Sequence, residues 1–177
     1  MKRVALALLL GIAGPLAAAG APPEESSVSF EGGIGFTSDP DTFLLGFELP
    51  VQVAHEVEIG PLLQLGVADN HTIVAPTLNA RYVFDLPSWG VWEQRPTLRR
   101  FHPMVFGGLG FAYIDQDTSS ENRDGTGFLL DLGFGVEYEL AGRVSVGSRM
   151  TFNVLPGSVA GENFFFSWQV GTVRFRF

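Results

Sequence analysis

Charged side chains recur at alternate positions of segments that are otherwise apolar. Glu137 and Glu139 stand two residues apart, as do Arg174 and Arg176. Residues at this spacing share one face of a β-strand. The six carboxylates and five guanidiniums nearly balance, and ion pairing in a buried space is the chemistry they suit, because each buried charge needs a partner. We predict a lumen network formed by Glu31, Glu48, Glu58, Arg81, Asp131, Glu137, Glu139, Arg143, Arg149, Arg174 and Arg176.

Catalytic chemistry has weaker support in the sequence. The chain has no cysteine, which excludes a thiolate metal site and a cysteine nucleophile. His71 with Asp69 is the one pairing that could serve a lipid-modifying hydrolase, and no serine motif accompanies it. The acidic stretch 115–125 lacks the glycine and the final glutamate of a calcium loop and is predicted to be a solvated loop. We expect no catalytic site, no metal and no cofactor; the hydrolase remains the enzymatic alternative.

Residues 1–21 have the layout of a secretory signal peptide. Lys2 and Arg3 precede an apolar stretch, which ends in small residues at Ala19-Gly20-Ala21. A transmembrane helix is the alternative, but the stretch is short and is interrupted by glycine and proline. We therefore expect export and a mature domain over residues 22–177. The formal charge of −8 argues against nucleic acid as a partner.

The mature chain alternates apolar and polar residues in eight segments separated by turn residues. Alternation of period two predicts β-strands, and no segment shows a helical period. The alternation blurs in the last segment, and the fifth is nearly apolar on both faces. The predicted strands are 28–36, 42–54, 57–67, 72–84, 104–114, 128–140, 143–154 and 164–177, with polar loops at 37–41, 68–70, 115–126 and 155–163.

Alternation alone leaves open which face is buried. A soluble lipocalin-like barrel hides the apolar face, whereas an outer-membrane barrel turns it toward lipid. Three features favour the membrane barrel: a mature chain without lysine, polar faces rich in small residues, and aromatic residues near strand ends. Tyr82, Tyr138, Trp89 and Trp92 are the predicted interface anchors, the two tryptophans within a long 85–101 connection.

The last five residues, with Val173, Phe175 and Phe177 at alternate positions, carry a resemblance. Together with the leader and the eight amphipathic segments, they resemble the small bacterial outer-membrane β-barrels of the OmpA, OmpX and OmpW type. The resemblance implies an all-β, eight-stranded antiparallel up-and-down transmembrane barrel. It also implies that the barrel-assembly machinery reads these three residues as its signal.

Prolines within the predicted strands limit barrel closure, since each removes a ladder hydrogen bond. Pro50, Pro61 and Pro103 fit the periplasmic rim, whereas Pro76 has no such explanation unless a bulge accommodates it.

We expect a structural or surface-interaction protein of the bacterial outer membrane, with membrane lipid and lipopolysaccharide as partners. One alternative is a narrow pore or a transporter for a small apolar ligand, suggested by Met104, Phe106 and Ile114 in one strand. The other is a soluble periplasmic lipocalin-like binding protein.

Overall fold

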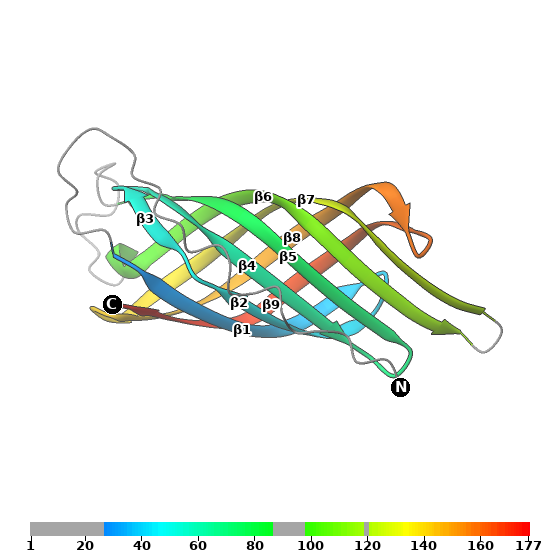
Figure 1. Cartoon of the computed structure of the whole chain (residues 1–177). Coiled ribbons are helices and arrows are strands. Elements are labelled where there is room, and N and C mark those ends of the chain that lie inside the picture. The colour runs from blue at the N-terminus through cyan, green and yellow to red at the C-terminus, as the bar shows by residue number, and fades with distance from the viewer. Residues whose placement is uncertain (1–26, 87–97, 119–120) are drawn as a thin grey trace.

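The computed structural model describes residues 27–86, 98–118 and 121–177, most of which lie in antiparallel β-strands (Figure 1). No helix within these ranges is long and apolar enough to cross a membrane. The elements are β1 (Ser29–Ser38), β2 (Thr42–Glu48), β3 (Val51–Ala54), β4 (Val57–Val67), β5 (His71–Val83), the short 3-10 helix η2 (Leu98–Arg100), β6 (Phe101–Thr118), β7 (Glu121–Ala141), β8 (Val144–Val159) and β9 (Glu162–Arg176).

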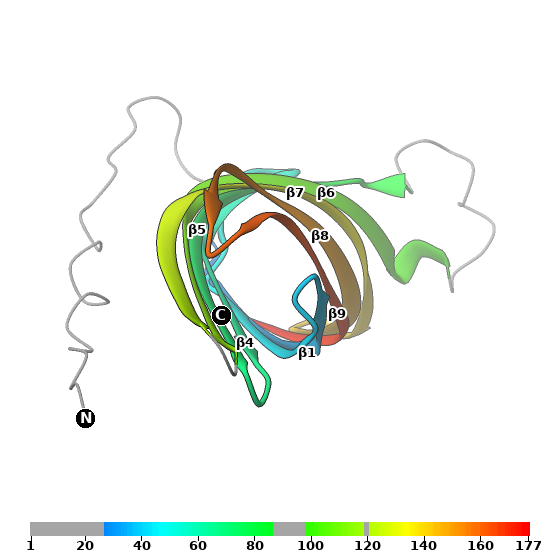
Figure 2. The ribbon, with the colours of Figure 1, turned by 90° about the vertical axis from the view of Figure 1, so that its right-hand side faces the viewer.

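The strands close into a barrel. β1 pairs with β2 on one side and with β9 on the other, which joins the two ends of the chain. β2 and β3 both pair with β4 and together act as one strand, interrupted at Pro50. Figure 2, which looks at the end away from the C-terminus, shows the resulting ring. The predicted eight-stranded antiparallel up-and-down barrel is confirmed, because every neighbouring pair is antiparallel.

No bulge accommodates Pro76. The register between β5 and β6 is the same on both sides of this residue, with Val74 opposite Tyr113 and Thr77 opposite Gly110. The pairing only skips Ala75 and Pro76, so the proline sits in a gap of the ladder and faces outward. One missing N–H is tolerated there because the rungs on either side hold the strands together.

The bulge lies in β9 instead and explains the blurred alternation of the last segment. Val170 and Gly171 both face outward, and the register against β1 shifts between Ile34 and Gly35. The extra residue exchanges the two faces of the strand, as bulges do. Phe165 and Arg174 therefore both point inward, although they stand an odd number of positions apart.

Two predicted polar loops are largely strand, so those boundaries were wrong. β6 and β7 continue pairing through Asp115 opposite Asp124 to Thr118 opposite Glu121. β8 runs to Val159, and a two-residue turn leads into β9 with positive φ at Ala160 (51°) and Gly161 (98°). Positive φ at both positions suits a tight hairpin. The two strands of a hairpin hydrogen-bond each other's backbone groups. Strand pairing can therefore continue past the end of the barrel even where the sequence is polar.

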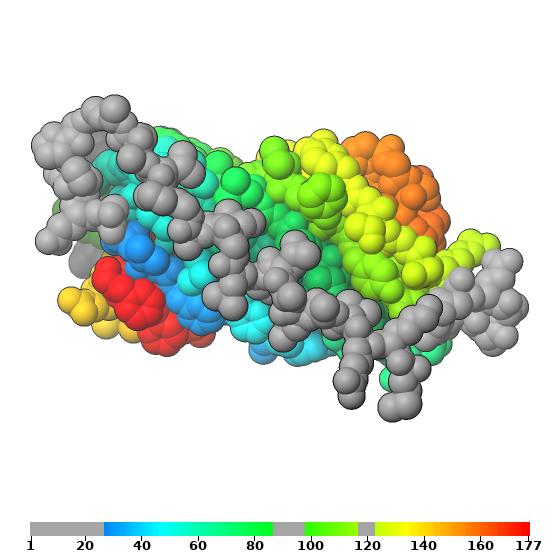
Figure 3. Space-filling model, in the orientation of Figure 1, coloured from blue at the N-terminus to red at the C-terminus, as the bar shows by residue number. Residues whose placement is uncertain are grey.

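The wall of the barrel is apolar outside and polar inside. Leu132 is 67% exposed and Phe134 49%, whereas their neighbour Asp131 is 6% exposed. The space-filling view shows the strands as oblique bands along this wall, with the end of β9 beside β1 (Figure 3). The lipocalin-like alternative required the apolar face to line the interior, so the observed orientation contradicts it.

Candidate functional site

The inside of the barrel toward the C-terminus is an ionic layer centred on Arg81. Its guanidinium lies 3.0 Å from a Glu31 oxygen and 2.9 Å from a Glu137 oxygen. It also pairs with Glu48, and its Nε lies 3.7 Å from Glu58. Arg81 is 2% exposed. One arginine on β5 thus connects carboxylates from β1, β2, β4 and β7, which ties opposite sides of the barrel together.

Two further arginines complete this layer. Arg149 pairs with Glu48, lies 3.6 Å from Glu31 and donates to the Gln169 side-chain carbonyl at 2.8 Å. Arg174 lies 2.5 Å from Glu58 and 3.1 Å from Glu137. Seven of the predicted network residues therefore meet inside the barrel: Glu31, Glu48, Glu58, Glu137, Arg81, Arg149 and Arg174.

The other four predicted members lie elsewhere. Arg176 stands at the rim, 30% exposed, with its guanidinium 3.7 Å from Glu137. Glu139 also lies at the rim, 3.9 Å from His102. Arg143 is exposed in the β7–β8 turn, outside the lumen. Asp131 faces inward but accepts a hydrogen bond from Asn79 at 3.2 Å instead of pairing with an arginine.

A neutral polar ring follows the ionic layer toward the other mouth. Gln64 donates to Asn153 at 3.3 Å, and Asn153 donates to the Ser167 hydroxyl at 3.1 Å. The Ser167 hydroxyl donates back to Gln64 at 2.7 Å, which closes the ring across β4, β8 and β9. Each of the three side chains is hydrogen-bonded to the other two, so the ring occupies the lumen without an ionised group.

Asn153→Ala is expected to lower the free energy of unfolding by about 1–3 kcal/mol, because Gln64 and Ser167 each lose a buried partner. Urea titration of the barrel in detergent micelles measures the effect. Gln52→Ala, near the β3–β4 turn, is the control and should change little. A loss of unfolding free energy no larger than that of the control would show that water replaces the hydrogen bonds of Asn153.

An apolar cap, which sequence reasoning missed, lies inside the barrel at the end away from the C-terminus. Phe165 (0% exposed) packs there with side chains from β5 to β8. Gly127 leaves the space that Val159 occupies over β7. The sequence feature that could have predicted the cap is the weak alternation of segments 72–84 and 104–114. The inward positions of these segments are apolar at this end of the barrel. The cap consists of Ile73, Ala75, Ala112, Ile114, Leu129, Leu155, Val159 and Phe165.

The residues that suggested an apolar ligand path are packed against the protein itself. Phe106 is 4% exposed and lies against Arg149, whose guanidinium carbon is 5.3 Å from the ring centroid. Met104 and Phe106 occupy the space that Gly135 and Gly133 leave on β7. Ile114 belongs to the apolar cap.

Most of the remaining predicted residues that the structure describes lie at the end that holds the C-terminus. Tyr82 hydrogen-bonds Glu56, and the Tyr138 ring contacts that of Phe101 with centroids 4.8 Å apart. Val173, Phe175 and Phe177 all point outward. Trp89 and Trp92 lie outside the described residues. His71 is half-buried and Asp69 exposed at the opposite end.

No family model and no curated protein matches the sequence. Solved structures do match the fold. Neisserial surface protein A aligns with a TM-score of 0.63 and 14% identity, over 85% of this chain and 96% of its own. Ail, the attachment invasion locus protein of Yersinia pestis, aligns with a TM-score of 0.56 and 10% identity, over 86% and 99%. A designed transmembrane β-barrel aligns with a TM-score of 0.54 and 10% identity, over 88% and 98%.

These likenesses extend over most of each chain. Together with the outward apolar wall and the salt-bridged interior, they show that this chain has the fold of the small outer-membrane β-barrel proteins.

Proposed function

We propose that the chain is a sealed barrel of the bacterial outer membrane with a structural or surface-interaction role. The filled lumen carries this proposal: an ionic layer, a neutral polar ring and an apolar cap follow one another along its length. Eight strands enclose a space just wide enough for side chains. Neither a pore nor a catalytic site is needed to explain the inward-facing residues.

Export is part of the proposal. Residues 1–21 direct the chain to the periplasm and are removed, leaving residues 22–177 to form the barrel. Cell fractionation followed by gel electrophoresis tests the location. The protein should partition with the outer membrane, need detergent for extraction, and migrate differently in SDS before and after boiling. Release into the periplasmic extract without a mobility shift would overturn it.

Assembly depends, in this proposal, on the terminal Val173, Phe175 and Phe177, which the barrel-assembly machinery reads. All three face outward, where a partner can contact them before the barrel closes. Phe177→Ala is expected to lower the folded amount in the outer membrane several-fold while leaving refolding of purified protein in detergent unchanged. The comparison separates recognition from stability. Equal loss in both measurements would assign Phe177 a purely structural role.

The surface role is proposed from charge at the mouth that the apolar cap closes. Asp39, Asp41, Asp69 and Asp124 are exposed there, and Arg123 is an exposed cation among them. The structure of Ail in complex with the heparin analogue sucrose octasulfate shows a polyanion bound to that barrel. The acidic mouth here favours instead lipopolysaccharide phosphates bridged by divalent cations. Chelation with EDTA should release lipopolysaccharide from the purified protein; retention after chelation would contradict this role.

A further inference from the structure

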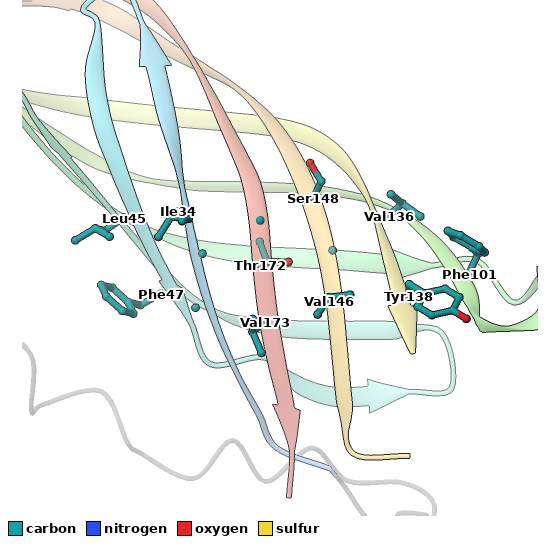
Figure 4. Close-up of a pocket in the computed structure, with 14 residues that line it drawn as sticks. Ile34, Leu45, Phe47, Phe101, Val136, Tyr138, Val146, Ser148, Thr172 and Val173 are labelled. Atoms are coloured by element: carbon teal, nitrogen blue, oxygen red, sulfur yellow. The ribbon is translucent and has the colours of Figure 1, made fainter. Parts of the chain in front are cut away.

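The outward wall of the barrel is hollowed by an apolar groove of about 690 Å³ (Figure 4). Its floor lacks large side chains, because Gly32 and Gly171 lie there beside Ser148. Phe47 stands on one side and Phe101 on the other. The β9 bulge borders the groove: its extra residue, Val170, is unpaired with β1 and lies beside Gly171, and both face outward.

The groove lies within one membrane leaflet's depth of the rim at the end where the chain terminates. From Ile34, which lines it, to the start of β1 at Ser29 the chain advances about 17 Å. With the usual strand tilt this is roughly 13 Å along the barrel axis. Half of a bilayer's hydrocarbon core is about 15 Å. In the proposed orientation, this is the periplasmic leaflet.

Two exposed arginines lie close in sequence to lining residues at the end of the groove nearest the rim. Arg143 is exposed in the turn between β7 and β8, whose residues Tyr138 and Val146 line the groove. The carbonyl of Arg143 accepts a hydrogen bond from the backbone N–H of Arg176 at 2.9 Å, which fixes this turn beside β9. Arg100 is also exposed and directly precedes Phe101, another lining residue.

We propose that this groove is a binding site for an anionic phospholipid of the periplasmic leaflet. One acyl chain lies along the floor over Gly171, and the phosphate is held by Arg143 and Arg100. Apolar lining within one leaflet's depth, with two exposed arginines at the neighbouring rim, matches both parts of such a lipid. The proposal rests on the proposed membrane location and names a lipid partner for the outer wall.

The test uses two of the three described glycines at which an added side chain would meet open space. A Cβ at Gly171 or at Gly157 would meet no atom within 4 Å, so a side chain fits at either position. Gly171→Leu fills the groove, and Gly157→Leu makes the same change at the opposite end of the barrel. Binding of phosphatidylglycerol and phosphatidylcholine to delipidated protein is titrated by native mass spectrometry. The mobility shift on boiling shows that each variant is folded.

Gly171→Leu is expected to weaken phosphatidylglycerol binding about tenfold, the cost of losing roughly two methylenes of contact. Gly157→Leu should bind as the unmodified protein does. Arg143→Gln should reduce the preference for phosphatidylglycerol over phosphatidylcholine by about fivefold. Equal binding by both glycine variants, with the mobility shift retained, would overturn the lipid site and leave the membrane barrel intact. A change of oligomeric state in Gly171→Leu without a change in lipid binding would assign the groove to a second copy of the chain.

Discussion

Arg81→Met is expected to destabilise the folded barrel by about 3–5 kcal/mol, the usual cost of removing one partner from a buried ion network. The substitution keeps much of the side-chain volume, but it removes the guanidinium that forms ion pairs with the carboxylates of Glu31 and Glu137. Total stabilities are only about 5–15 kcal/mol, so this loss is a large share. Urea titration in detergent micelles, followed by the SDS mobility shift, measures it.

Arg143→Met is the matched control because Arg143 is exposed in a turn. Its effect on unfolding should stay within about 0.5 kcal/mol. Adding Glu31→Gln to Arg81→Met should recover part of the loss, since one uncompensated charge disappears. An Arg81→Met barrel as stable as the control would show that the ionic layer is hydrated and does not hold the strands together.

Phe165→Ala is expected to cost about 3–5 kcal/mol, because it removes the largest side chain of the apolar cap and leaves a cavity. Phe165 is fully buried among residues from four other strands, so the surrounding side chains have little freedom to collapse into the space. The same urea titration measures the loss.

The adjacent Phe164 provides a control of identical chemistry. Its side chain is 43% exposed on the outer wall, and its ring contacts that of Phe152 with centroids 6.4 Å apart. Phe164→Ala should therefore cost clearly less than Phe165→Ala. Equal costs, or a larger cost at Phe164, would contradict the inward orientation that the β9 bulge gives to Phe165.

Alternation predicted the strands and much of the ionic layer because inward and outward positions differ in chemistry along most of the barrel. Glu31, Arg81 and Arg174 could be selected as charges on otherwise apolar strands. Arg143 and Glu139 satisfied the same criterion but lie in a turn and at the rim. Spacing assigns a face and gives no depth along the barrel, so it could not separate these two from the network.

The apolar cap and the bulge could not be predicted in the same way. Inward positions such as Ile73 and Phe165 carry apolar side chains, so both faces of the strand look alike and the period disappears. The extra residue at Val170-Gly171 then exchanges the faces within β9. The sequence of β9 alone does not reveal such a shift. The shift is recognised only from the pairing of β9 with β1 and β8.

The most direct test of the sealed lumen is single-channel recording of the purified barrel in a planar lipid bilayer, with insertion verified by the SDS mobility shift. The ionic layer, the polar ring and the apolar cap together predict no stepwise current from the inserted protein in concentrated potassium chloride. Stable unitary steps that scale with salt concentration would contradict the sealed barrel and establish a pore.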